Sequence, residues 1–372
     1  MSHVTGIMII DAPASALNNA GEDKETRADN AVAVKFIKTP GGRYPYVSAQ
    51  AVRYWLRTQL AGQNGWACSP VFRETRIAYT DANPAQYDED DLFGYMRAAS
   101  KSKDEKETAK RAEIAAASTP VDEQTGEVTR ISPFRVGTVV AVSPVRITQD
   151  FGTMARAEGD PVLHQHQFYR AHLKGPLALD LTSAGTFFAS RRVGYKNLDS
   201  NRIAATEKVG GKKTDNKVRG FEAWRLPHPV RASRVSMLIE AIGRMEGGAK
   251  QTLHLTDTAP SVLALCVCKS GNQPLQRLFT ADPAEERTVL RLDVLAEVLN
   301  TFGEDIQSDV YLGWATGFLD EERASLEKAL KGEGPNPVPE KWRDRIHVSH
   351  PREASSQLAA VLQKKESEGW FA

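Results

Sequence analysis

One short stretch constrains the fold most, because an extended segment there turns into a helix at a defined residue. Residues 43–57 have the sequence RYPYVSAQAVRYWLR. Tyr44 to Val47 is rich in β-forming residues and is kept extended by a proline, and Ser48 is a preferred helix N-cap. The apolar residues that follow recur at helical spacing. The sequence therefore predicts a strand that ends at Val47 and a helix that begins near Ser48.

The start of this helix has the chemistry of a phosphate site. Its first turn offers free backbone N–H groups and the positive end of the helix dipole, and Arg53 and Arg57 are four residues apart on one face. Two interpretations stay open at this point. The helix either binds phosphate or is an ordinary amphipathic helix with two solvated arginines.

The composition is that of a soluble globular protein. The chain has 372 residues, of which 41% are hydrophobic and 26% are charged. This length predicts one large domain with insertions, or two domains. No stretch approaches the ~20 apolar residues of a membrane span, and the apolar run 6–10 is too short for a signal peptide. We expect a cytoplasmic protein with no membrane contact.

Cysteine and histidine offer two weak metal motifs. Cys266 and Cys268 lie in an apolar run, where a strand would point both thiols to one face, so we expect a buried structural pair. His164 and His166 have the same spacing but no third ligand nearby. We assign neither a metal nor a cofactor.

The net charge of +1 hides an uneven distribution of charge along the chain. Residues 130–225 hold 16 Lys and Arg against 8 Asp and Glu, whereas residues 282–372 hold 11 against 18. A basic middle can face a polyanion, and unlike faces also suit head-to-tail stacking of copies.

The order of predicted elements indicates an α+β protein. Apolar runs predict strands over 4–10, ended by Pro13, and over 31–37, with further strands within 131–147, 165–173, 177–181 and 262–267. Helical spacing follows Ser48 and recurs over 230–245. The core order is β-α-β-β-α-β with one extra early strand, which is a ferredoxin-like sheet, the scaffold of RNA-recognition modules. Beyond residue 281, helices over 289–302 and 320–330 predict a mostly helical region.

Four segments look like surface features, and for three of them two interpretations stay open. Asn18 and Asn19, with Gly21, form either an anion nest or a plain turn. The charged segment 101–117 predicts an exposed helical insertion. Residues 148–161 predict a protruding hairpin, whose Phe151 and Met154 either wedge between bases or pack on the arm itself. The basic segment 191–225 is either a solvated loop or a groove for a single strand.

Signatures of catalysis are missing. The chain has no phosphate-binding loop of the G-x-x-x-x-G-K-[ST] type, no G-x-S-x-G and no H-E-x-x-H. Asp11, at the end of the first strand, is placed like an active-site carboxylate, but the sequence shows no base beside it. We therefore expect a protein that is not an enzyme.

Six motifs occur in order along the chain: residues 4–21 (VTGIMIIDAPASALNNAG), 33–38 (AVKFIK), 44–50 (YPYVSAQ), 150–154 (DFGTM), 166–170 (HQFYR) and 247–252 (GGAKQT). In this order they resemble the DevR-type CRISPR-associated family, the repeated crRNA-binding backbone subunits of type I-B Cascade within the RAMP group. The resemblance extends from the N-terminus to about residue 270.

The resemblance implies a shape like a right hand. It implies an RRM-like palm over 1–280, with helical fingers at about 81–130, a β-hairpin thumb at about 143–170 and a basic loop at about 185–225, and a mostly helical C-terminal region over 281–372. Implied partners are crRNA, target DNA, further copies arranged head to tail, and other Cascade subunits. The residues expected to bind RNA are Asn18, Asn19, Lys35, Lys38, Tyr46, Ser48, Gln50, Arg53, Arg57, Phe151, Met154, Arg156, His166, Lys250 and Gln251.

Two other functions remain as alternatives. Type III relatives cut target RNA with a loop aspartate, so the runner-up is a metal-dependent ribonuclease of the same fold that uses Asp11. The family name also suggests a transcriptional autoregulator, but nothing here resembles a helix-turn-helix.

Overall fold

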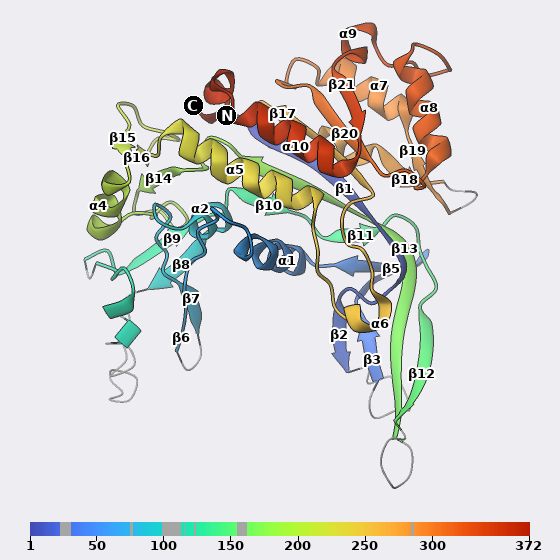
Figure 1. The fold of residues 1–372 in the computed structure, drawn as a ribbon, viewed down its shortest axis with the longest axis horizontal. Coiled ribbons are helices and arrows are strands. Elements are labelled where there is room, and N and C mark those ends of the chain that lie inside the picture. Colours follow the sequence, from blue (N-terminus) through green and yellow to red (C-terminus); the bar gives the residue numbers. More distant parts are fainter. Residues whose placement is uncertain are drawn as a thin grey trace.

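A large sheet runs through the length of the molecule (Figure 1). The computed structural model describes residues 1–22, 31–74, 77–98, 113–114, 116–122, 124–154, 162–282, 284 and 286–372. Within these residues the sheet has twelve strands, and its main path has the order β21-β20-β17-β1-β13-β11-β5-β4. The bounds along this path are β21 Ile346–Ser349, β20 Val310–Trp314, β17 Val262–Cys268, β1 His3–Ser15, β13 Val162–Asp180, β11 Val139–Ala141, β5 Gly42–Val47 and β4 Phe36–Thr39.

The N-terminal strand β1 lies at the centre of the sheet. It pairs antiparallel with β13 on one side and with β17 on the other, and Ile7, Ile9 and Ile10 are fully buried. Burial on both faces explains why its sequence is a continuous apolar run. The predicted end at Pro13 is wrong, because β1 continues to Ser15. Pairing with β17 stops at Ile9 and the register with β13 shifts after Ala12, so no ladder bond requires a proline N–H there.

One face of the sheet is covered by helices α1 (Ala49–Ala61), α5 (His228–Gly243) and α10 (Pro351–Leu362), as Figure 1 shows. The predicted helices after Ser48 and over 230–245 are thereby confirmed. Helices α5 and α10 pack closely together, since a Cβ on Gly243 would lie 2.1 Å from the Ser355 hydroxyl. Helix α10 therefore belongs to the main core, together with η2 (Lys365–Phe371), which buries Phe371.

The other face of the sheet carries a second core. Ile7, Ile9 and β17 residues pack there against α7 (Leu292–Thr301), α8 (Asp320–Leu330) and α9 (Glu340–Arg343). Cys266 and Cys268 are buried in this core with their sulfurs 3.5 Å apart, which confirms the expected buried pair. The predicted helix over 320–330 is also confirmed. The smaller elements here are η1 (Pro274–Arg277), β18 (Phe279–Ala281) and β19 (Thr288–Leu290).

The C-terminal region is less helical and less separate than predicted. Strands β20 and β21 continue the main sheet beyond β17, and α10 returns to the face that α5 covers. Short apolar runs such as 310–314 do not distinguish a strand from a buried helical turn in the sequence. The region after residue 281 is therefore an extension of the sheet with its own helical cover.

The basic segment 191–225 is folded, and its prediction as a loop is wrong. It contains α4 (Ser200–Lys208), β15 (Lys212–Lys213) and β16 (Glu222–Arg225), and the two strands join β14 (Thr186–Ala189) in a three-stranded sheet. Asp199 caps α4 and pairs with Arg202 at 2.7 Å, where both side chains are fully buried. A buried arginine with its own carboxylate is indistinguishable in sequence from a surface charge pair.

The region where fingers were predicted, at about 81–130, contains a short helix and one strand pair, and a hairpin precedes it. Strands β6 (Val71–Arg73) and β7 (Ala78–Thr80) form one hairpin, β8 (Tyr95–Ala98) pairs with β9 (Glu127–Arg130), and α2 (Asp88–Phe93) lies between them in the chain. The acidic residues of α2 face inward, since Asp91 is fully buried and binds Arg130 at 2.5 Å and Arg234 at 2.9 Å. Most of the predicted helical insertion 101–117 lies outside the described residues.

A β-arm projects from the sheet, as Figure 1 shows, and confirms the predicted hairpin. Strand β12 (Thr148–Met154) pairs antiparallel with the first part of β13, from Thr148 opposite Phe168 to Met154 opposite Val162. Strands β2 (Asn19–Glu22) and β3 (Ala31–Val34) join at the arm's base, and β10 (Phe134–Val136) pairs with the far end of β13. The predicted strand over 31–37 is thus two strands. Arg156 and the side chain of Met154 lie outside the description.

Candidate nucleic-acid interface

Segments far apart in the sequence meet where α1 and the arm approach each other. The Lys35 N–H donates to the Asn18 carbonyl at 2.9 Å, the Tyr46 N–H donates to the Lys35 carbonyl at 3.1 Å, and the Asn18 amide donates to the Tyr46 carbonyl at 3.4 Å. The Ala249 N–H donates to Leu17 at 3.1 Å, beside Asn18. We call the surface around Asn18, Lys35, Tyr46, Ser48 and Lys250 the corner. It brings together residues from four of the six motifs.

The predicted helix start at Ser48 is confirmed. The Ser48 backbone is extended, its hydroxyl accepts from the Ala51 N–H at 3.3 Å, and α1 begins at Ala49. The N–H groups of Ala49 and Gln50 have no acceptor among the described residues. Two backbone donors at the positive end of a 13-residue helix thus remain available to an anion.

The two arginines on α1 connect the helix to neighbouring elements. Arg53 donates to the carbonyls of Phe93 at 2.6 Å and Phe134 at 2.7 Å, and to the Ser132 hydroxyl at 3.0 Å. Burial, and then the nearby Arg57, lower the pKa of Arg53 to about 10. Arg57 lies 3.3 Å from Glu89. Their role in phosphate binding stays a prediction, but most of the Arg53 donors already have partners.

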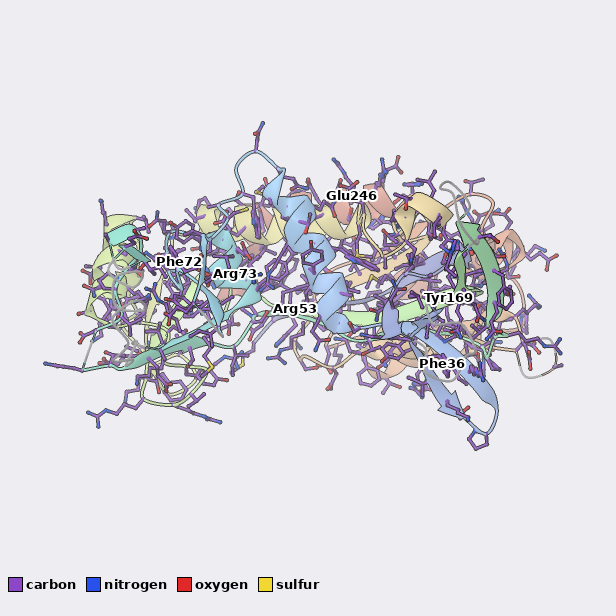
Figure 2. All side chains as sticks on the ribbon, turned by 90° about the horizontal axis from the view of Figure 1, so that it is seen from below. Phe36, Arg53, Phe72, Arg73, Tyr169 and Glu246 are labelled. Carbon is purple, nitrogen blue, oxygen red and sulfur yellow. The ribbon has the colours of Figure 1, made fainter. Side chains whose placement is uncertain are left out.

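Figure 2 shows Arg53 between the β6–β7 hairpin and the arm. On one side lie Phe72 and Arg73 of the β6–β7 hairpin, and on the other lie Phe36 and Tyr169 near the arm. Tyr54, on the same helix as Arg53, is 66% exposed. The helix therefore lies in the middle of this face, and a polymer crossing the face would pass over α1.

The glycine pair in residues 247–252 permits a close contact with α1. A Cβ would lie 2.3 Å from the Trp55 ring at Gly247 and 2.6 Å from Leu17 at Gly248, and both residues have positive φ. The Gln251 amide donates to the Gly247 carbonyl and, at 3.0 Å, to the Thr256 carbonyl. Gln251 therefore holds the loop that leads into α6 (Gln251–His254), while Lys250 is left-handed with φ 56° and its ammonium has no partner among the described residues.

The arm adds imidazole and aromatic groups to the corner. His166 lies 3.5 Å from Asp150 across the hairpin, and Phe151 is 65% exposed. The His254 ring is 6.0 Å from His166 and 5.4 Å from Phe168. Burial, followed by His166 and Lys250, lowers the pKa of His254. No sequence pattern links His254 to the arm, so sequence reasoning missed it.

The remaining predicted residues lie along the adjoining strands. Lys38 is exposed on β4, and Arg43, which sequence reasoning did not select, stacks over Phe36 at 4.9 Å. Asn19 is on β2, where its Oδ1 is buried without a partner among the described residues, and Gly21 has φ 94°. Because Asn19 to Glu22 form a strand, the alternative of a plain turn is wrong for these residues, and the anion nest stays a prediction.

Asp11 is not isolated, so the expectation from the sequence is wrong on this point. His172 on β13 is opposite Asp11 in the β1–β13 ladder, and its Nε2 lies 3.6 Å from the Asp11 carboxylate. Its Nδ1 lies 2.9 Å from the Thr288 hydroxyl. Burial lowers the pKa of His172, and Asp11 partly offsets that effect. A contact between two residues that are 161 positions apart leaves no signal in a single sequence.

Across the part of the chain that the structure describes, no helix is long and apolar enough to cross a membrane.

Comparisons with known proteins found structural likenesses of low sequence identity. No family model and no curated protein matches the chain. A chain in a solved structure described as a "CRISPR RNA-guided surveillance complex" has 13% identity and a TM-score of 0.48, covering 96% of this chain and 99% of that chain. Another, described as "CRISPR RNA-guided surveillance complex, pre-nicking", has 12% identity and a TM-score of 0.46, covering 97% and 99%. At this level the likeness decides neither fold nor function.

Proposed function

We propose that this chain is a non-catalytic, crRNA-binding backbone subunit of a type I, I-B-like CRISPR Cascade complex, which polymerises along the guide RNA and presents it to target DNA. The observation that carries the proposal is the corner. Residues from four motifs of the DevR-type resemblance, spread over more than 200 positions, are joined there by backbone hydrogen bonds.

The chemistry of the corner suits the backbone of a single strand. The free N–H groups of Ala49 and Gln50 lie at the start of α1, and Lys35 and Lys250 add positive charge at the corner, with Lys38 farther along β4. Contacts of this kind fix the position of a nucleic acid without selecting its sequence. A subunit that must hold any guide needs this property.

Two further features support the proposal. The elements β1, α1, β10, β13, α5 and β17 follow one another in the β-α-β-β-α-β order of a ferredoxin-like, RRM-like palm. The exposed Phe151 on the arm is an apolar side chain positioned to press between bases, as the thumbs of the resembled family do.

The salt dependence of guide binding tests the proposal. The triple variant Lys35→Ala, Lys38→Ala and Lys250→Ala should weaken binding to any guide sequence. It should also flatten the slope of log K against log salt by about 2, since each phosphate contact on a single strand contributes roughly 0.7. The matched control removes Lys328, Lys331 and Lys341 from the acidic C-terminal region. An unchanged slope in the triple variant refutes the corner as the guide site.

A second candidate function is favoured by the pair of Asp11 and His172. A carboxylate within 3.6 Å of a half-buried imidazole is an arrangement that general acid–base catalysis uses. The runner-up is therefore a ribonuclease acting at Asp11. The purified complex is incubated with paired target RNA in Mg²⁺ or Mn²⁺. We expect intact RNA, whereas cleavage that disappears in both Asp11→Ala and His172→Ala would establish the runner-up.

A further inference from the structure

A cavity far from the corner is lined by basic residues. It has a volume of about 430 Å³ and lies between β15, β16 and the first turn of α5. Its lining includes Lys212, Arg225, His228, Arg231 and Glu368. The corner loop follows the other end of α5, whose 16 residues span about 24 Å. The cavity is thus a separate place on the molecule.

Arg231 is a buried cation without a paired carboxylate. It is 3% exposed, and it donates to the carbonyls of Ala184 at 2.7 Å, Leu181 at 3.0 Å and Phe371 at 2.8 Å. No described carboxylate forms an ion pair with it, and its Nη1 has no acceptor within the described part of the chain. Burial, and then Arg225, lower the pKa of Arg231 to about 9, and Asp91 and Asp180 offset only part of this effect.

Two more cations at the cavity are also free to bind. Arg225 is half-buried and uses only its Nε, which donates to the Thr186 hydroxyl at 3.3 Å. Lys212 has no partner among the described side chains, whereas its neighbour Lys213 is paired with Glu222 at 2.9 Å. Glu368 lines the same cavity but forms no ion pair with these cations. The unpaired cations Lys212, Arg225 and Arg231 outnumber the two carboxylates at the cavity, which belong to Glu368 and to Ala372, the last residue given.

The first turn of α5 also favours anion binding at the cavity. Its N-cap is Pro227, which supplies no side-chain cap, and Pro229 has no N–H to donate. The N–H of His228 has no acceptor in the described structure, so a backbone donor and the positive end of the helix dipole both face the cavity.

We propose that this cavity binds a phosphate group, with Arg231 at its base, Arg225 and Lys212 at its sides and the His228 N–H at its end. Arginine and lysine around a helix start match the charge and the acceptor oxygens of phosphate. The phosphate belongs either to a nucleic-acid backbone or to a free phosphate compound. The inference does not depend on the function proposed for the corner.

The test uses the double variant Lys212→Ala and Arg225→Ala, which leaves Arg231 and its carbonyl contacts in place. Titration of the whole protein with inorganic pyrophosphate, followed by ³¹P NMR, should show binding that weakens about tenfold or more in the double variant, since two charged hydrogen-bond donors to the phosphate are removed. Arg323→Ala, which removes a half-buried arginine paired with Glu327 on α8, is the control and should bind as the parent does.

A second arm identifies the source of the phosphate. If pyrophosphate does not bind the parent, single-stranded RNA without terminal phosphates is titrated at several salt concentrations. A slope that flattens by about 1.4 in the double variant supports a backbone phosphate in the cavity. Thermal unfolding of each variant checks that the fold is intact, and the lysine variant of the corner, tested in parallel, shows whether the two sites act separately. Equal affinity and equal slope in parent and double variant overturn the proposal.

Discussion

At the scale of residues, many arginines of this chain bind groups inside the protein. Arg130 pairs with Asp91 and donates to the carbonyls of Ser183 and Thr186, and Arg202 is fully buried beside Asp199. The planar guanidinium can bind several acceptors at once, which suits it to such positions. The count of 16 basic residues over 130–225 therefore overstates the basic surface, because several of these charges are neutralised or enclosed.

Arg53 should matter more for stability than Arg57. Arg53→Ala leaves two carbonyls and a hydroxyl without their donor, so we expect the free energy of unfolding in urea to fall by roughly 2 to 4 kcal/mol. Arg57→Ala removes an ion pair with Glu89 that water partly screens, and should cost about 1 kcal/mol or less. Equal losses would show that the Arg53 contacts contribute little.

Asp90 should make stability depend on pH. Burial raises the pKa of Asp90 to about 6, from an ordinary value of 3.8. The folded state therefore holds this proton more tightly than the unfolded state. The stability that this proton contributes is fully present below about pH 3.8 and is lost as the pH rises through 6. Relative to the parent, Asp90→Asn should gain up to roughly 3 kcal/mol of unfolding free energy between pH 4 and pH 7.

Urea unfolding at a series of pH values measures this gain. Asp122→Asn provides the opposite trend, because the Ser200 hydroxyl lowers the pKa of Asp122. That carboxylate stabilises the fold above its unfolded pKa and loses the effect as the pH falls. A gain at Asp90 that does not vary with pH would contradict the assignment.

At the scale of elements, the arm combines a well-paired hairpin with an exposed apolar side chain. Phe151→Ser should leave the melting temperature of the subunit nearly unchanged, since the ring is 65% exposed. In assembled complexes the same change should weaken nuclease protection of the guide at regular intervals. Val193→Ser, at a residue 68% exposed in a turn outside the arm, is the control. A footprint identical to that of the parent would remove Phe151 from the interface.

Local chemistry explains which elements could be predicted from the sequence. The helix start at Ser48, α5, α8, β17 and the arm each have a cap, a period or an apolar run that specifies them. The contacts of Asp11 with His172 and of His166 with His254 depend on how distant strands align, and no local pattern encodes that. The same holds for α4 and the small sheet around β16, whose buried charges look like surface charges in the sequence.

At the scale of the whole molecule, the acidic and basic regions lie on different elements, and this supports association of unlike faces. We expect copies to add head to tail along RNA, because a contact between two different faces that does not close generates an open filament. Particle mass, measured by light scattering, should then increase in steps as the guide lengthens. A mass that stays at one or two copies for every guide would contradict this arrangement.

The length of β13 has a mechanical consequence. Its 19 residues, about 60 Å when extended, run without interruption from the arm into the middle of the sheet. The far end is tied down at Asp180, whose carboxylate accepts from the Ser183 hydroxyl at 2.8 Å and pairs with Arg219. A strand in such a ladder cannot slip by one residue without turning its side chains to the wrong face. Paired strands connect Phe151 to the helix start at Ser48, from β12 to β13, β11 and β5, so we expect the same separation in every copy of the protein.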